Sequence, residues 1–406
     1  MGAIIQGVKV ENVDEDEKLH YKARALEIKV KDKDETLKLE TPTRFSNQQE
    51  INAKAWIPSE VPIKSYAGVV DLRLNEKEIN GLLNDNITAS RRLSNLKKAA
   101  NKFLHFPIRA VLIQPTLSGK SGFKYLNKNP QLKERFLRLS MQFAKEAGFN
   151  TYVIPYLDSD IEKTKALYKE LIGKEGETLE ITPAIDMGMR PKNLEPLLKY
   201  IKDTYILTGL TNNVTLIYKS YAQVPVSYDI AWSQFRDTNT MITLVGAQRY
   251  ISDVGGISSL HLGSFVLGDA FSLKVNRPFF SQDKEGRGEK RVKNLRFFDH
   301  KTLKLNQLLT AKNDTTKLTN LLEEMTSVYG NDTDYIKQAI NNLEEAKTDD
   351  KKYGSISAIT KVHEFVESKL EFSTESEFIK KTEAKDYIKS KLDLETAISK
   401  VSKKTL

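Results

Sequence analysis

Short apolar runs alternate with amphipathic stretches through the middle of the chain. The runs that we predict to be buried strands are residues 69–73, 109–115, 151–155, 179–186, 205–208, 226–232, 241–246 and 259–262. Between most of them apolar residues recur at helical spacing, most clearly in residues 130–147, where Gly148 ends the pattern. Alternating strands and helices are typical of parallel sheets with right-handed crossovers.

This number of strand-helix units within residues 60–280 predicts an α/β fold, a (β/α)8 TIM-like barrel. The last strands are expected to be irregular, because the connections at 233–240 and 247–257 are shorter than the dozen residues that a parallel crossover needs. An open doubly wound sheet is the alternative. The first strand is not followed by the Gly-x-Gly-x-x-Gly pattern of dinucleotide-binding folds.

The segments on either side of the predicted barrel have different patterns. Residues 21–40 alternate apolar and polar positions around a polar turn, which predicts a β-hairpin. Residues 301–406 show helical spacing and little strand pattern. We therefore expect an N-terminal β-hairpin and entry segment (1–59), an α/β barrel (60–280), a basic linker loop (281–300) and a helical C-terminal region (301–406).

The composition excludes several kinds of site and partner. The 406 residues include no cysteine, which rules out disulfides, thiolate nucleophiles and cysteine-based metal centres. The five histidines are scattered, so any metal would need mainly carboxylate ligands; no metal ligand is assigned, and the cofactor stays open. Because no apolar run reaches the ~18 residues of a membrane span, and no secretory signal is evident, we expect a cytoplasmic protein without a membrane partner.

The net charge of +9 favours a polyanionic partner such as nucleic acid, although a lysine-rich surface explains it equally well. The densest basic segment lies in residues 281–296. Its candidate nucleic-acid-binding residues are Lys284, Arg287, Lys290 and Arg291. The alternative is a solvated linker between barrel and C-terminal region.

In a barrel the catalytic and binding residues follow the C-terminal ends of the strands. That rule selects Asp71, Arg73, Gln114, Asp158, Asp160, Asp186, Arg190, Thr208, Asn212, Asp229, Gln234, Gln248, Arg249 and His261. Asp158 and Asp186 end neighbouring predicted strands, so we expect their carboxyl groups to face one pocket as the catalytic pair. For each, the alternative is a carboxylate that caps the next helix.

The substrate-binding candidates supply hydrogen bonds, charge and a stacking surface. Arg190 could bind a phosphate or carboxylate in bidentate fashion, or pair structurally with Asp186. Trp232 could stack on a flat ring, although core packing also explains such an aromatic residue. The substrate-binding set is Arg190, Gln114, Asp229, Gln234 and Trp232.

The order of elements is similar to that of the tRNA-guanine transglycosylase superfamily and its DNA-acting relatives. An Arg-bearing hairpin, Arg24 through Leu39, is followed by Thr41-Pro42 and then by the predicted barrel. The resemblance implies a barrel, a polyanionic partner and base exchange through paired aspartates. The chain lacks the family's Cys3His zinc site and its Asp-Ser-Gly-Gly-Phe-Gln and Phe-Asp-x-Val-x-Pro-Thr-Arg motifs, so no catalytic residue is transferred.

Two functions remain as hypotheses, and whether the protein is an enzyme stays open. The first is a barrel protein that acts on nucleic acid or on a nucleobase- or phosphate-bearing substrate, with transglycosylase-like base exchange as one form. The second is a non-catalytic nucleic-acid-binding or assembly protein on a degenerate barrel. Its helical C-terminal region would contact a protein partner or a second copy of the chain.

Overall fold

A computed structural model describes most of the chain. The described residues are 4–32, 35–53, 67–116, 121–158, 160–172, 179–252, 255–274, 287–329, 337 and 340–402.

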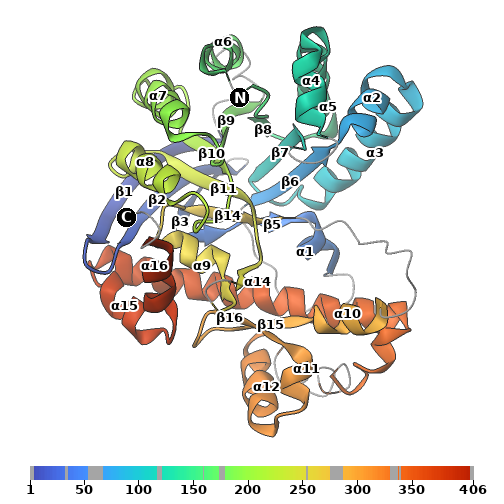
Figure 1. Cartoon of the computed structure of the whole chain (residues 1–406), viewed down its shortest axis with the longest axis vertical. Helices are drawn as coiled ribbons and strands as arrows, with labels where there is room; N and C mark the ends of the chain where they lie inside the picture. Colours follow the sequence, from blue (N-terminus) through green and yellow to red (C-terminus); the bar gives the residue numbers. More distant parts are fainter. Residues whose placement is uncertain are drawn as a thin grey trace.

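A parallel sheet forms the centre of the molecule, and it curls into a nearly closed barrel (Figure 1). Its strands are β4 (Thr43–Arg44), β5 (Ser46–Asn47), β6 (Ala67–Leu74), β7 (Ile108–Pro115), β8 (Thr151–Ile154), β9 (Glu180–Asp186), β10 (Asn213–Ile217), β11 (Met241–Ala247) and β14 (Ala270–Leu273). The order is β4-β14-β11-β10-β9-β8-β7-β6-β5. Only Phe45 separates β4 from β5, so the two ends of the sheet lie next to each other in the chain.

Helices surround the sheet on the outside. They are α1 (Gln48–Ala53), α2 (Glu76–Asn84), α3 (Asn86–Lys102), α4 (Gly122–Lys128), α5 (Pro130–Ala147), α6 (Ile161–Leu171), α7 (Pro191–Ile201), the π-helix η2 (Lys202–Ile206), α8 (Pro225–Phe235) and α9 (Ser259–Ser264). Local sequence fixes several helix ends: Asn75 and Glu78 form a capping box on α2, and Asp160 caps α6. The α5 helix ends at Gly148, as its pattern predicts.

Three predicted strands are wrong, and four strands of the parallel sheet, β4, β5, β10 and β14, were not predicted. Residues 205–208 begin in η2, residues 226–232 lie in α8, and residues 259–262 lie in α9. Strands β10 and β14 take the corresponding places in the sheet. A short apolar run has the same appearance in a buried strand and a buried helix, so its pattern alone cannot separate the two.

The predicted N-terminal hairpin is confirmed, and it belongs to a three-stranded antiparallel sheet. Strand β1 (Ile5–Asp16) pairs with β2 (Tyr21–Asp32), which pairs with β3 (Glu35–Glu40). This sheet covers the end of the barrel where the strands begin. There Ile5 N donates to Glu180 at the start of β9, and Arg24 donates to the carbonyl of Thr240 just before β11.

Arg24 connects the N-terminal sheet to the barrel. Both Arg24 and Asp269 are fully buried, and Arg24 Nη2 lies 2.6 Å from Asp269 Oδ2. The guanidinium also donates to the carbonyls of Phe235, Thr238 and Thr240. A buried arginine needs this many acceptors, because each N–H removed from water otherwise loses its hydrogen bond.

The C-terminal region is mostly helical, as predicted, but it also contains a small antiparallel sheet. The helices are α10 (Arg287–Lys293), α11 (Leu308–Lys312), α12 (Thr315–Tyr329), the 3-10 helix η4 (Glu345–Lys347), α14 (Asp350–Lys380), α15 (Ala384–Ser390) and α16 (Leu394–Ser402). The sheet has the order β12 (Tyr250–Ile251), β13 (Ile257–Ser258), β16 (Lys304–Gln307) and β15 (Arg296–Asp299). Two of these strands come from the connection between β11 and α9.

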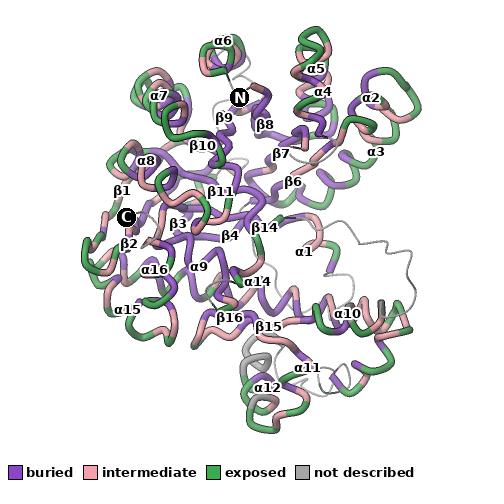
Figure 2. Tube along the Cα trace, in the orientation of Figure 1, coloured by how far each residue is buried: buried purple, intermediate pink, exposed green. Residues whose placement is uncertain are grey.

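The long helix α14 joins the C-terminal region to the barrel. Phe372 stacks on Phe271 of β14, with ring centroids 5.5 Å apart, and belongs to the main core. Ile356 and Ile359, at the other end of the helix, belong to a second core with Phe297 of β15. Figure 2 shows the strands and the inner side of α14 as buried, with exposed residues on the outer turns of the surrounding helices.

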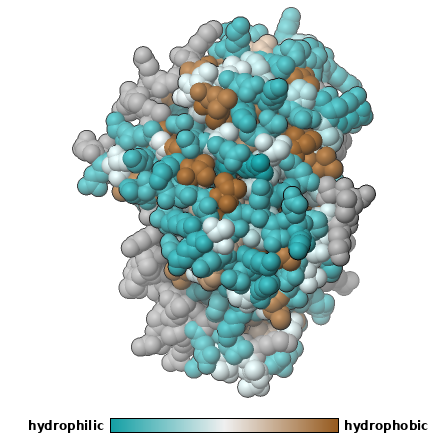
Figure 3. Space-filling model, turned by 90° about the vertical axis from the view of Figure 1, so that its left-hand side faces the viewer, coloured by the Kyte–Doolittle hydropathy of each residue, from teal (hydrophilic) through white to brown (hydrophobic). Residues whose placement is uncertain are grey.

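The surface carries no large continuous apolar area in the view of Figure 3, where hydrophobic residues form small separate groups on a hydrophilic face. Among the described residues, no helix has the length and apolar composition that crossing a membrane requires.

Candidate functional site at the barrel mouth

Polar side chains gather inside the barrel at the end where the strands finish, which we call the barrel mouth. Asp71 and Arg73 lie on β6, Gln114 on β7 and Asp186 at the end of β9. Arg73 is the register partner of Gln114. Partners in a parallel sheet point to the same face, so these side chains share the interior of the barrel.

Three of these residues form one hydrogen-bonded group. Arg73 Nε donates to Asp71 Oδ2 at 2.9 Å, and Gln114 Nε2 donates to Asp71 Oδ1 at 3.2 Å. The Asp71 side chain is 3% exposed and that of Arg73 is 29% exposed. The carboxylate therefore serves as a buried anchor, while part of the guanidinium is accessible from the mouth.

Gly246 of β11 provides the space that Arg73 occupies. Its φ is +78°, and a Cβ atom there would collide with the Arg73 guanidinium and approach Asp71 Oδ2 to 3.2 Å. β11 and β6 are not neighbours in the sheet, so Arg73 extends across the interior. A residue other than glycine would be strained in its backbone and would clash with this side chain.

Asp186 is the carboxyl group whose environment is most unusual at the mouth. It is 8% exposed, and its Oδ1 accepts a 3.0 Å bond from Gly188 N. Burial raises its pKa above the ordinary value, although the Gly188 N–H and the charges of Lys219 and Arg73 oppose this shift. A carboxyl group with a raised pKa can donate or accept a proton closer to neutral pH than a solvated one.

A stacked pair of aromatic rings lies near Asp186. Tyr156, which follows β8, stacks on Phe123 of α4 with ring centroids 5.3 Å apart. Burial raises the pKa of Tyr156 to about 12, and the negative charges of Asp186 and Asp158 add to the shift. Tyr156 therefore keeps its hydroxyl proton at neutral pH and lies close enough to both aspartates to be affected by their charges.

Asp158 makes its bonds outside the barrel interior. Its Oδ2 lies 2.6 Å from Lys133 Nζ of α5, and its Oδ1 accepts from Asp160 N. Burial would raise the pKa of Asp158, but the bonds from Lys133 and Asp160 and the nearby lysine charges together lower it. Asp158 lines a groove of about 870 Å³ between α4, α5 and α6. Its carboxylate is thus bonded toward the helices, whereas that of Asp186 faces the interior.

The other predicted substrate-binding residues, Gln114 excepted, lie away from the interior of the barrel. Arg190 is an exposed residue at the start of α7, and among the described residues it makes no bond to the Asp186 side chain. Asp229, Trp232 and Gln234 lie on α8. There Asp229 pairs with Lys22, and Trp232 Nε1 donates to Glu15 at 2.9 Å, so both face the N-terminal sheet.

The candidate nucleic-acid-binding residues are described only in part. Lys284 lies outside the described residues, and for Arg287 and Lys290 the structure describes the backbone of α10 alone. Arg291 Nη2 lies 2.6 Å from Asp350 Oδ1, and its guanidinium lies 4.1 Å from the centre of the Tyr353 ring. Arg291 therefore connects α10 to the start of α14.

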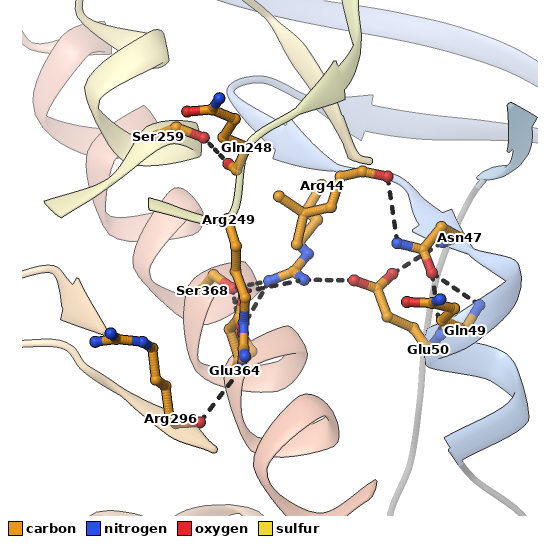
Figure 4. A network of polar contacts seen from close by, with 11 residues as sticks. Arg44, Asn47, Gln49, Glu50, Gln248, Arg249, Ser259, Arg296, Glu364 and Ser368 are labelled. Carbon is orange, nitrogen blue, oxygen red and sulfur yellow. Dashed lines mark hydrogen bonds and ion pairs between the residues drawn. The ribbon is translucent and has the colours of Figure 1, made fainter. Parts of the chain in front are cut away.

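A buried network of charges supports the rim of the mouth (Figure 4). Arg44 of β4 pairs with Glu50 of α1, and its Nη1 lies 2.6 Å from Ser368 Oγ of α14. Glu364 of α14 pairs with both Arg44 and Arg249. Since Arg249 follows β11, this network fixes the loop after Gly246 to the long helix α14.

Sequence reasoning selected four mouth residues as strand ends but missed others. Lys219 and Tyr156 come from the loops after β10 and β8. Gly246 acts through a contact across the barrel, for which sequence gives no signal. Among the described residues, no group of three or more carboxylate and imidazole side chains is arranged to hold a metal ion.

Two comparisons with known proteins found no significant match. No protein-family model matches the chain, and no curated protein matches it significantly.

Proposed function

We propose that the protein is a (β/α)8-barrel enzyme whose active site is the barrel mouth. In this count β4 and β5 are one strand interrupted at Phe45. The hydrogen bond from Phe45 N to Phe271 O, 2.8 Å long, continues the pairing with β14 and supports the count. A barrel of this class carries its catalytic groups at the C-terminal ends of the strands, where the polar residues of the mouth lie.

The observation that carries the proposal is the pair of carboxyl groups in contrasting surroundings. Asp186 is buried, with a raised pKa, while Asp71 is bonded to Arg73 and Gln114. Carboxyl groups whose environments differ in this way can take different roles in one reaction, one as proton donor and the other as charge stabiliser. We assign the proton transfer to Asp186 and substrate orientation to Asp71, Arg73 and Gln114.

The substrate that fits this arrangement is a compound that bears a nucleobase or a phosphate group. The amide of Gln114 and the guanidinium of Arg73 offer the donors and acceptors that a base edge requires. In base exchange, Asp186 would donate its proton to the departing ring nitrogen, which takes the electron pair of the broken glycosidic bond. A ring nitrogen of the incoming base would then form the new bond to the sugar carbon with its own electron pair and return its proton to Asp186. Asp158, bonded to Lys133, has no part in this assignment.

The test is a turnover screen of nucleosides, nucleotides, RNA and DNA, with products identified by mass spectrometry. We expect Asp186→Asn to abolish turnover and to leave ligand binding largely intact, because the amide cannot transfer the proton. Asp229→Asn is the matched control, since that side chain is 44% exposed on α8. Retention of both turnover and binding in Asp186→Asn would sink the proposal, and salt-sensitive nucleic-acid binding without turnover would favour a non-catalytic protein.

A further inference from the structure

Lys219 is a positively charged residue at the barrel mouth that has no ionic partner in the described part of the chain. It follows β10 directly and is exposed. Among the described residues its ammonium group forms no ion pair, whereas Lys133 and Lys22 pair with nearby aspartates. Its charge is nevertheless close enough to Asp186 to oppose the effect of burial on the pKa of that carboxyl group.

Gly188 determines where the Lys219 side chain lies. A Cβ atom at position 188 would come within 2.9 Å of Lys219 Cε, 3.4 Å of Lys219 Cγ and 3.3 Å of Asp186 Oδ1. The backbone at Gly188 is not in the left-handed region, so its conformation alone does not demand glycine. The missing side chain instead lets the aliphatic part of Lys219 pack against the turn that follows Asp186.

The charges of the mouth do not balance around Lys219. Arg73 is neutralised by its bond to Asp71, with Nη2 and Oδ2 2.8 Å apart. Asp186 is the remaining acid, and its burial favours the protonated form, which carries no charge. Whenever Asp186 holds its proton, Lys219 lies beside a neutral carboxyl group and has no compensating negative charge among the described residues.

We propose that Lys219 binds an anionic oxygen of the substrate, from a phosphate or a carboxylate group, next to the Asp186 carboxyl group. The inference rests on the proposed function in taking the barrel mouth as the substrate site. It makes Lys219 the specificity-determining residue, which selects substrates with a negative charge close to the reacting atom. An anion placed there also disfavours a second negative charge on Asp186. Anion binding is therefore coupled to retention of the proton that Asp186 transfers.

The test is calorimetric titration of the full chain at low ionic strength with inorganic phosphate and, separately, with acetate. We expect Lys219→Gln to weaken binding of the preferred anion about tenfold or more, the usual effect of removing a charged hydrogen-bond partner. Lys219→Arg should retain most of the affinity. The preferred probe identifies the source of the anion: phosphate indicates a phosphorylated substrate, and acetate a carboxylic acid.

Two further variants separate a specific site from general surface charge. Gly188→Ala keeps the lysine but displaces its side chain, so we expect a loss of affinity similar to that of Lys219→Gln. Lys199→Gln, at an exposed position of α7, should bind as the wild type does. In the pH range in which Asp186 of the free protein titrates, binding should also take up protons, and Asp186→Asn should remove this uptake.

Unchanged affinity in Lys219→Gln, an equal loss in Lys199→Gln, or no binding of either anion by the wild type would overturn the inference. These outcomes are independent of the turnover test. Loss of turnover in Asp186→Asn together with Lys219-independent anion binding would leave the proposed function standing and reject the role of Lys219.

Discussion

Replacing Arg24 by methionine tests how the N-terminal sheet is held on the barrel. Arg24 donates to both oxygens of Asp269 and to three buried backbone carbonyls. A fourth carbonyl, that of Arg236, accepts a longer bond of 3.4 Å from Nη1. Methionine fills much of the same volume but supplies no donor. The variant therefore leaves a buried carboxylate whose remaining donor among the described residues is Ile242 N, 2.7 Å away.

The expected cost follows from the unpaired charge. Removing one partner of a buried ion pair destabilises proteins by about 3–5 kcal/mol, because the other charge stays away from water. Total stabilities are about 5–15 kcal/mol, so the variant loses a large fraction of its unfolding free energy. Burial already raises the pKa of Asp269 against the effect of Arg24, and the Met variant should raise it further. The loss of unfolding free energy in Arg24→Met should consequently shrink as the pH falls and Asp269 takes up a proton.

Urea unfolding followed by tryptophan fluorescence measures this effect, since Trp232 donates to Glu15 of the N-terminal sheet. Lys22→Ala is the matched control on the same strand. Its partner Asp229 is 44% exposed, so the change should cost below about 1 kcal/mol. The double variant Arg24→Met, Asp269→Leu should recover part of the loss. An Arg24→Met cost no larger than that of Lys22→Ala, or no recovery in the double variant, would refute the reasoning.

Three other substitutions have predictable effects on stability. Asp186→Asn should stabilise the protein at neutral pH by about 0.5–2 kcal/mol, because a carboxyl group with a raised pKa lowers the unfolding free energy as the pH rises through that pKa. Thermal denaturation at pH 7 and at acidic pH should show that this gain shrinks in acid. A loss of stability at pH 7 would contradict the prediction. His363 is fully buried, and burial lowers its pKa from 6.5 to about 3, so acid should reduce the unfolding free energy by up to about 1.4 kcal/mol per pH unit in that window. His363→Leu should remove this dependence in urea unfolding at a series of pH values, and an identical slope in both proteins would argue against it. Gly148→Ala should lower the unfolding free energy by about 1 kcal/mol in the same assay, because φ at this position is +89° and no neighbouring atom lies within 4 Å of the added Cβ. An unchanged unfolding free energy would show that the left-handed backbone does not require glycine there.

Sequence predicted five strands of the sheet, β6 to β9 and β11, and the three central ones show why. Residues 109–115, 151–155 and 179–186 are continuous apolar runs flanked by long amphipathic helices, the pattern of parallel strands buried on both faces. Residues 226–232 have a similar composition but form α8, which Pro225 opens at its first turn. That proline was the available signal for a helix, because proline is favoured at this position.

The prediction of a strand at residues 226–232 also misplaced two candidate site residues. Reading 226–232 as a strand placed Asp229 and Trp232 at the mouth, but the helix turns both toward the N-terminal sheet. Asp186 and Gln114 were identified because they end true strands. Lys219 could not be found in this way, since its position depends on the contact with Gly188 and on no strand pattern.

The network around Arg44 has a consequence for the order in which the protein can fold during synthesis. Arg44 and Glu364 are separated by 320 residues, and α14 packs on the strand that carries Arg44. This strand leaves the ribosome early, whereas the helix that shields it leaves late. Until α14 has emerged, the growing chain must therefore hold a barrel whose α14-facing side chains, such as Arg44 and Phe271, are uncovered. A nascent chain arrested before residue 350 should bind chaperones and be sensitive to protease, although every strand of its barrel has already been made.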